Sequence, residues 1–257
     1  MAPIIHVPES VPDAVELLRE GGAVLGGGTA LMPRINTSAH DVEALVSLRR
    51  AGLAGIELAG GVATVGAATT LTQLRRDDRL AFLHPAVESI ASPTIRNLAT
   101  VGGNLFVPQP YGDLAVCLLA LDAEVRLAER TAPVEDVLER GAPGELVTAV
   151  SFRVPAAGEW FYTKAMRRRM NSASIVTVAA VVDGDGARIA LGGAGARPVR
   201  ARAAEAALAG GPLDRERVEA AAAAAAQDAE PFSDAYASAW YRGRVLPVHL
   251  RRALLGE

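Results

Sequence analysis

The sequence predicts an α+β fold in which a mixed N-terminal region precedes a three-stranded antiparallel sheet with helices. Two patterns indicate this fold: short strands alternate with helices over the first 154 residues, and a meander of three strands followed only by helices fills the end of the chain. Hydrophobic residues make up 50% of the 257 residues, enough to bury a sizeable core. The turn-rich segment 155–158 (PAAG) predicts domains at 1–154 and 159–257.

The first 54 residues are expected to form a small β-α-β unit, the first subdomain of the N-terminal domain. Residues 4–7 have the pattern of a strand, Ser10 is a good N-cap for a helix over residues 11–20, and Gly21 and Gly22 end that helix. The unit is completed by a strand at 23–25, a helical turn at 30–34 and a strand at 43–48.

The second subdomain, about 55–154, is expected to begin with a hairpin. Two strands in residues 56–66 (IELAGGVATVG) are joined across Gly60 and Gly61. Helices follow at 70–76, 85–91 and 113–121, and strands at 124–128 and 146–154. In the C-terminal domain we expect strands at 161–164, 175–182 and 188–191, and helices at 201–209, 214–229 and from 235 onward.

The composition argues against several classes of protein. Basic and acidic residues are nearly balanced, 26 against 29, without a basic cluster, so nucleic acid is a poor candidate partner. Cys117 is the only cysteine, which excludes an internal disulfide or an iron–sulfur cluster held by this chain alone and fits a cytoplasmic location. The four histidines show no metal-ligand spacing, and no segment approaches the roughly 20 apolar residues of a membrane span. We therefore expect neither a metal site nor a membrane span.

A glycine-rich segment at residues 24–29 (VLGGGT) follows a predicted strand and precedes a helical turn. Without Cβ atoms its backbone NH groups can approach an anion such as a phosphate, although such a segment is about as often only a tight turn. The dinucleotide fingerprint GxGxxG is not met, because Leu31 stands where its third glycine would be.

A second segment, residues 93–105 (PTIRNLATVGGNL), repeats these ingredients, and the two loops together could clamp a pyrophosphate. The alternatives are a plain turn at Gly102 and Gly103 and a surface charge at Arg96. Asp113 follows nine residues after Asn104, at the start of an apolar helix. From the residues alone it is more often an N-cap than an acceptor for ribose hydroxyls.

These motifs together resemble one known family, the FAD-binding (medium) subunits of molybdenum hydroxylases of the xanthine dehydrogenase and carbon monoxide dehydrogenase type. The segment VLGGGTAL at 24–31 is similar to the family's AGGTDL loop, and IRNLATVGGN at 95–104 to its IRNxATxGGN. Pro110 and Asp113 fall on its PxxD, and residues 120–123 on its ALDA. Segments at 162–164, 175–179 and 239–242 resemble its C-terminal domain, so the resemblance covers essentially the whole chain.

The resemblance implies a two-subdomain FAD-binding fold of the vanillyl-alcohol oxidase type, with an extended FAD between the subdomains. The glycine loops would hold the pyrophosphate, and Asp113 would bind the adenosine ribose. Lys164 would lie near the flavin ring, where its positive charge stabilises an anionic reduced flavin, and Ile90 and Leu146 would flank the ring. The complete set implied to bind the cofactor is Leu25, Gly26, Gly27, Gly28, Thr29, Ala30, Ile90, Thr100, Val101, Gly102, Gly103, Asn104, Asp113, Leu146 and Lys164.

The implied function is electron transfer without substrate chemistry of its own, and no catalytic residue is assigned. The FAD would take electrons from [2Fe-2S] clusters in a small partner subunit, supplied by a molybdenum cofactor in a large molybdopterin-binding subunit, and pass them to NAD, oxygen or a quinone. Two positions depart from the family pattern. Ala30 replaces the family's Asp or Ser, and Ser172 stands where many members carry Asp. The alternatives are a self-sufficient flavin-dependent oxidoreductase of the same fold and a non-catalytic binding or scaffold module.

Overall fold

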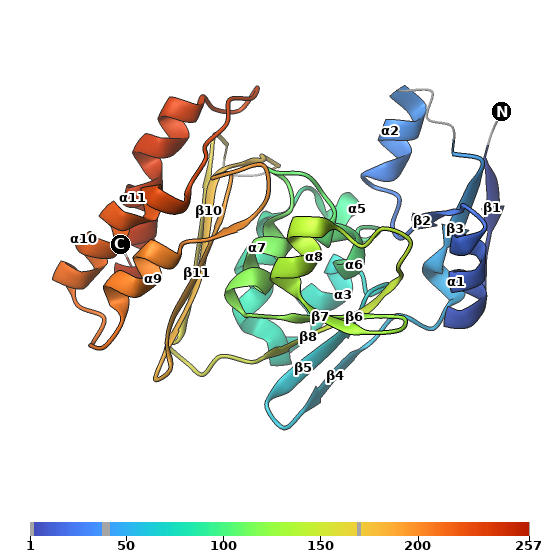
Figure 1. The fold of residues 1–257 in the computed structure, drawn as a ribbon, viewed down its shortest axis with the longest axis horizontal. Coiled ribbons are helices and arrows are strands. Elements are labelled where there is room, and N and C mark those ends of the chain that lie inside the picture. The colour runs from blue at the N-terminus through green and yellow to red at the C-terminus, as the bar shows by residue number, and fades with distance from the viewer. Residues whose placement is uncertain (1–2, 38–41, 169–170, 257) are drawn as a thin grey trace.

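The computed structural model describes residues 3–37, 42–168 and 171–256. Three sheets follow one another along the longest axis of the molecule (Figure 1): a three-stranded N-terminal sheet, a five-stranded middle sheet and a four-stranded C-terminal sheet. The two termini lie at opposite ends. The mixed helix and sheet content, with an antiparallel sheet and helices at the C-terminal end, confirms the predicted fold class.

The N-terminal unit forms as predicted, a parallel sheet of order β1-β3-β2 with α1 packed against it. Ser10 caps α1 by accepting the backbone NH of Asp13 at 3.2 Å, and Gly21 follows the helix with φ of +98°. The elements are β1 (Ile4–His6), α1 (Val11–Arg19), β2 (Ala23–Leu25), α2 (Leu31–Thr37), β3 (Ala44–Ser47) and the 3-10 helix η1 (Leu48–Arg50).

The middle sheet is antiparallel with the order β4-β5-β8-β6-β7, and the predicted hairpin forms its β4-β5 edge. Its strands are β4 (Ile56–Ala59), β5 (Val62–Gly66), β6 (Glu124–Leu127), β7 (Thr131–Pro133) and β8 (Val147–Arg153). The helices around it are α3 (Leu71–Arg76), η2 (Asp78–Leu83), α4 (His84–Ser89), α5 (Pro93–Arg96), α6 (Val101–Leu105), α7 (Asp113–Ala120) and α8 (Val134–Arg140).

Five described elements of this middle region were not predicted: α5, α6, β7, α8 and the 3-10 helix η2. The first two are single turns inside the second glycine segment, where Gly102 and Gly103 disfavour a helix and the side chain of Thr100 caps it by accepting the NH of Gly103. Strand β7 is a three-residue edge strand that ends on Pro133, a position at which proline is tolerated.

The C-terminal sheet has the order β12-β11-β10-β9 and contains one strand more than the three predicted. Its strands are β9 (Trp160–Met166), β10 (Ser174–Asp183), β11 (Gly186–Gly192) and β12 (Val199–Arg200), the last too short to leave a pattern. The helices are α9 (Arg202–Leu208), α10 (Arg215–Ala224), η3 (Ala225–Asp228) and α11 (Ala239–Leu255). The last begins later than expected because its N-cap is Ser238, which accepts the NH of Tyr241.

Helix α7 lies between the middle sheet and the inner face of the C-terminal sheet, while α9, α10 and α11 cover the outer face (Figure 1). All eight residues of α7 are buried. Burying each of its leucine and valine side chains stabilises the fold by about 1.5–3 kcal/mol. Its first residue, Asp113, is therefore carried into the interior. Among the helices of the described residues, none is both long and apolar enough to cross a membrane.

Replacing Leu118 of α7 by alanine is expected to lower the free energy of unfolding by about 2–5 kcal/mol, because the cavity lies in the central core. Urea unfolding followed by circular dichroism measures this. The matched control is Leu58→Ala on the edge strand β4, whose side chain is 40% exposed. A loss as small for Leu118→Ala as for the control contradicts the central position of α7.

Candidate cofactor-binding site

A cavity of about 1140 Å³ runs between the N-terminal unit, the helices of the middle region and the inner edge of the C-terminal sheet. It exceeds the roughly 300–1000 Å³ typical of small-molecule sites, and so accommodates an extended ligand. Most of the residues named from the sequence line it: Gly26, Gly27, Gly28, Thr29, Ala30, Ile90, Thr100, Gly102, Gly103, Asn104, Asp113, Leu146 and Lys164. Leu25 and Val101 do not line it.

The first glycine loop, residues 26–30 between β2 and α2, has the free donors of an anion site. None of its five backbone NH groups donates a hydrogen bond to an acceptor within the described residues. Gly28 has φ of +71°, a conformation that side-chain-bearing residues rarely adopt. Consecutive NH groups without internal partners, at the wall of a cavity, are the donors that a phosphate group requires.

The second glycine loop differs from the first, because its NH groups are already used within the protein. Val101 donates to the carbonyl of Thr69 at 2.9 Å, Gly102 to that of Ala67 at 2.9 Å, and Gly103 to the hydroxyl of Thr100 at 3.2 Å. What this loop still offers is the side-chain amide of Asn104, whose oxygen accepts the NH of Leu114 at 3.1 Å and whose nitrogen has no acceptor in the described chain. Over residues 101–104 the groups left to donate to a ligand are therefore on side chains and not on the backbone.

The two loops lie directly against each other, and this contact explains several of the glycines. A Cβ on Gly27 would lie 1.8 Å from the carbonyl oxygen of Leu98, and one on Gly26 would lie 2.8 Å from the hydroxyl of Thr100. Gly102 faces Ala67 in the same way, at 2.8 Å. Gly26 and Gly27 are required by close packing of the N-terminal unit on the middle region, and Gly102 by packing within the middle region, whether or not a ligand is bound.

The surface-charge interpretation of Arg96 is wrong. Its guanidinium donates to three backbone carbonyls, those of Glu88, Ile90 and Ala91. It thereby ties the second glycine segment to the end of α4, where Ile90 is 5% exposed and lines the cavity. Leu146, which also lines the cavity, is 1% exposed and packs with the core of the N-terminal unit.

Asp113 is not the N-cap of α7, since Gly112 occupies that position and makes no side-chain cap. Its carboxylate accepts the ammonium of Lys164 on one oxygen at 2.8 Å and the hydroxyl of Thr177 on the other at 2.6 Å. The side chains of Asp113 and Lys164 are 2% and 3% exposed. Burial raises the pKa of Asp113, and the nearby ammonium of Lys164 opposes that shift. The cap interpretation therefore fails because α7 is buried against a strand that supplies a cation.

Lys164 has a second partner, the backbone carbonyl of Ser89, at 2.9 Å. An ammonium group has three N–H bonds, and the third has no acceptor among the described residues although the side chain lines the cavity. Nearby, Tyr162 donates to the hydroxyl of Ser89 at 2.9 Å, because that hydroxyl already donates to the carbonyl of Ala86. Burial raises the pKa of Tyr162 well above its usual range, so its phenol stays protonated.

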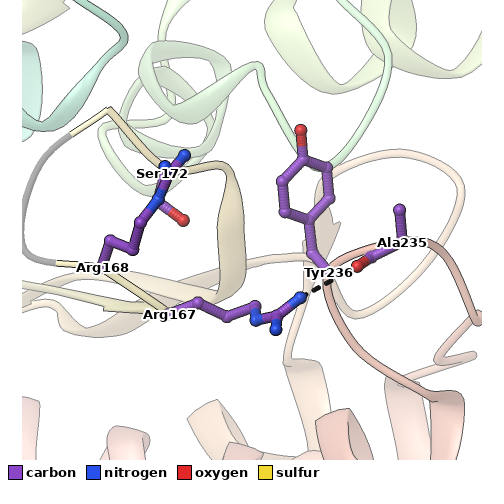
Figure 2. Close-up of a pocket in the computed structure, with 5 residues that line it drawn as sticks. All are labelled: Arg167, Arg168, Ser172, Ala235 and Tyr236. Carbon is purple, nitrogen blue, oxygen red and sulfur yellow. Dashed lines mark hydrogen bonds between the residues drawn. The ribbon is translucent and has the colours of Figure 1, made fainter.

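A second, smaller pocket of about 360 Å³ adjoins the cavity and shares Ser172 and Tyr236 with it. Figure 2 shows Arg167 reaching across this pocket to the carbonyl of Ala235, at 3.2 Å, with Arg168 and Ser172 on the far side. Tyr236 also bonds Tyr111 through the two hydroxyls, 2.9 Å apart, and this bond raises the pKa of Tyr111 to about 12. Of the residues that line this pocket, the sequence drew attention only to Ser172, as a departure from the family pattern, and the basic run after Lys164 was the one signal for Arg167 and Arg168.

The geometry is that of a protein with room for an extended ligand and with unpaired backbone NH donors at one wall of the cavity, as a phosphate-bearing cofactor requires. Residues 2–157 match the family model described as the FAD binding domain in molybdopterin dehydrogenase, and residues 160–256 match the CO dehydrogenase flavoprotein C-terminal domain. The chain therefore belongs to the family of FAD-binding subunits of molybdenum hydroxylases, the flavoprotein components of these oxidoreductases.

The similarity extends over nearly the whole chain. The carbon monoxide dehydrogenase medium chain of Afipia carboxidovorans is 33% identical, covering 97% of this chain and 94% of that protein. The 6-hydroxypseudooxynicotine dehydrogenase complex subunit alpha of Paenarthrobacter nicotinovorans is 32% identical over 96% and 92%. In the solved structure of reconstituted CO dehydrogenase from Oligotropha carboxidovorans, a chain of 31% identity superposes with a TM-score of 0.90, covering 99% of this chain and 97% of its own length.

Replacing Gly27 by alanine is expected to separate the two glycine loops, because the new methyl group would overlap the Leu98 carbonyl. We expect the free energy of unfolding to fall by about 1–3 kcal/mol or more and FAD binding to weaken with it. Urea unfolding and titration of flavin fluorescence measure both. Gly184→Ala is the control, since nothing lies within 4 Å of its added Cβ. Equal behaviour of the two variants would exclude the close loop contact.

Replacing Asp113 by asparagine removes the negative partner of a buried ammonium and is expected to destabilise the protein by about 3–5 kcal/mol. The double variant Asp113→Asn/Lys164→Met removes the charge as well, and should recover part of this loss. Chemical denaturation of the single and double variants provides the comparison. A double variant that is less stable than Asp113→Asn would show that the ion pair does not account for the loss.

Proposed function

We propose that this chain binds one FAD in the large cavity and serves as the electron-transfer subunit of a molybdenum hydroxylase. The observation that carries the proposal is the loop 26–30, whose NH groups lack internal acceptors where the cavity needs a phosphate site. The loop would hold the pyrophosphate, and the free N–H of Lys164 would face the flavin. When bound, FAD supplies a redox group that can accept electrons one at a time and donate them as a pair.

The other contributions of the protein are binding and electrostatics. The amide of Asn104 and the hydroxyl of Thr100 would donate to the phosphates or the ribityl chain, and Ile90 and Leu146 would enclose the ring from apolar walls. Asp113 is held 2.8 Å from Lys164 and so faces the same part of the ligand, where the remaining lone pairs of its carboxylate would accept hydroxyls of the ribityl chain and not those of the adenosine ribose. The positive charge of Lys164 would favour a negatively charged reduced ring, because the site is shielded from water.

Partners and location are part of the same proposal. The relatives are named as a medium chain and as one subunit of a complex, and this chain spans over nine-tenths of each. We place beside it a molybdopterin-binding large subunit and a small subunit with [2Fe-2S] clusters, in the cytoplasm, with domains at 1–154 and 159–257. Arg167 and Arg168, beside the cavity and without a carboxylate partner among the described residues, favour an anionic acceptor such as NAD over oxygen or a quinone.

The test is a visible absorption spectrum of the purified chain, followed by release and mass analysis of the chromophore. We expect flavin bands and FAD near one equivalent, together with no oxidation of organic substrates until the two partner subunits are added. Turnover by the isolated chain would favour the self-sufficient flavoenzyme instead. A colourless protein that does not bind added FAD would overturn the proposal.

A further inference from the structure

Thr177 binds the carboxylate oxygen of Asp113 that Lys164 does not bind. Its hydroxyl donates to the carboxylate at 2.6 Å, and the residue is fully buried. In the sheet register Thr177 on β10 lies directly opposite Lys164 on β9. The C-terminal sheet therefore grips the carboxylate of α7 with two neighbouring side chains, one on each oxygen.

The position of Thr177 in its strand is unusual for a purely structural residue. Residues 175–182 of β10 are IVTVAAVV, so this threonine is the one polar side chain in an otherwise apolar run. A buried hydroxyl is destabilising unless it forms a hydrogen bond, and valine would fill the same volume. The hydroxyl is therefore tied to its one partner, the carboxylate of Asp113.

Hydrogen bonds connect Thr177 to the cavity in two steps. With one oxygen held by Thr177 and the other by Lys164, the carboxylate of Asp113 cannot rotate without breaking a bond. The ammonium is then fixed by Asp113 and by the carbonyl of Ser89, which sets the direction of its third N–H. Thr177 does not itself line the cavity, but it determines where the one available donor of Lys164 points.

Resting on the proposed function, we propose that Thr177 is a positioning residue for the flavin, acting through Asp113 to hold the charge of Lys164 against the bound cofactor. Loss of its hydroxyl lets the Asp113–Lys164 pair reorient. The positive charge then moves away from the ring, which weakens FAD binding and stabilises less of the negative charge gained on reduction.

The experiment compares the full-length chain with Thr177→Val, Thr177→Ser and the control Thr163→Val. Thr163 lies next to Lys164 on β9 and is partly buried, and its side-chain hydroxyl makes no hydrogen bond to the described residues. The readouts are the FAD dissociation constant from fluorescence titration, the flavin midpoint potential and the urea unfolding midpoint. For Thr177→Val we expect a dissociation constant roughly tenfold higher, the size of a typical coupling between sites, and a more negative potential. Thr177→Ser and Thr163→Val should match the unmodified chain.

The outcomes separate this inference from the proposed function. An unmodified chain that binds no FAD overturns both. If that chain binds FAD while Thr177→Val has the same dissociation constant and potential as Thr163→Val, the positioning role alone is overturned. A changed unfolding midpoint with an unchanged potential, or failure of serine to restore the potential, also overturns it. Should Thr177→Val not fold, Thr177→Cys, with a weak thiol donor, carries the same two readouts.

Discussion

The buried ion pair between Asp113 and Lys164 is the interaction on which the arrangement of this protein depends. Placing a carboxylate and an ammonium in the interior is costly, and it is tolerated when the two charges pair closely and further hydrogen bonds support each of them. Here those partners come from separate parts of the chain: Thr177 for the carboxylate and the carbonyl of Ser89 for the ammonium. Because α7 carries Asp113 and β9 carries Lys164, the pair joins the middle region to the C-terminal sheet at the wall of the cavity.

The glycine loops provide the second constraint, and the two loops differ in how their backbone NH groups are used. The NH groups of Val101 and Gly102 in the second loop bind the segment that follows β5, and that of Gly103 binds the hydroxyl of Thr100, so this loop is a rigid support. The first loop rests on that support through Gly26 and Gly27, and its own NH groups are left without partners. A motif that occurs twice in the sequence thus becomes one loop with unused NH donors and one loop that supports it. The reason is that only one of the two loops lies next to backbone carbonyls that accept its donors.

Local pattern was enough to predict most of the fold. The β-α-β unit, the hairpin across Gly60 and Gly61 and the C-terminal meander all carry a clear periodicity or a turn signal. The one-turn helices α5 and α6 and the strand β12 have too few residues to show a period. In the site, the cavity-lining glycines follow from their motif, but the role of Asp113 does not. Its partners are 51 and 64 residues away, and nothing near it in sequence reveals a cation.

The hydrogen bond between Tyr111 and Tyr236, which both line the cavity, illustrates the same limit, since these residues are 125 positions apart and meet only in the folded chain.

The charges of the cavity are arranged so that a ligand can bind without disturbing the fold. Two of the three N–H bonds of Lys164 donate to the carboxylate of Asp113 and to the carbonyl of Ser89, and the third remains available to a ligand. The loop 26–30 likewise has donors that the native hydrogen bonding does not use. A cofactor with a pyrophosphate and a ring that gains negative charge can therefore be bound by groups already in position, and the ordering cost of binding falls on the ligand more than on the protein. Preorganisation of this kind requires rigid supports, which the packed glycines and the buried ion pair supply.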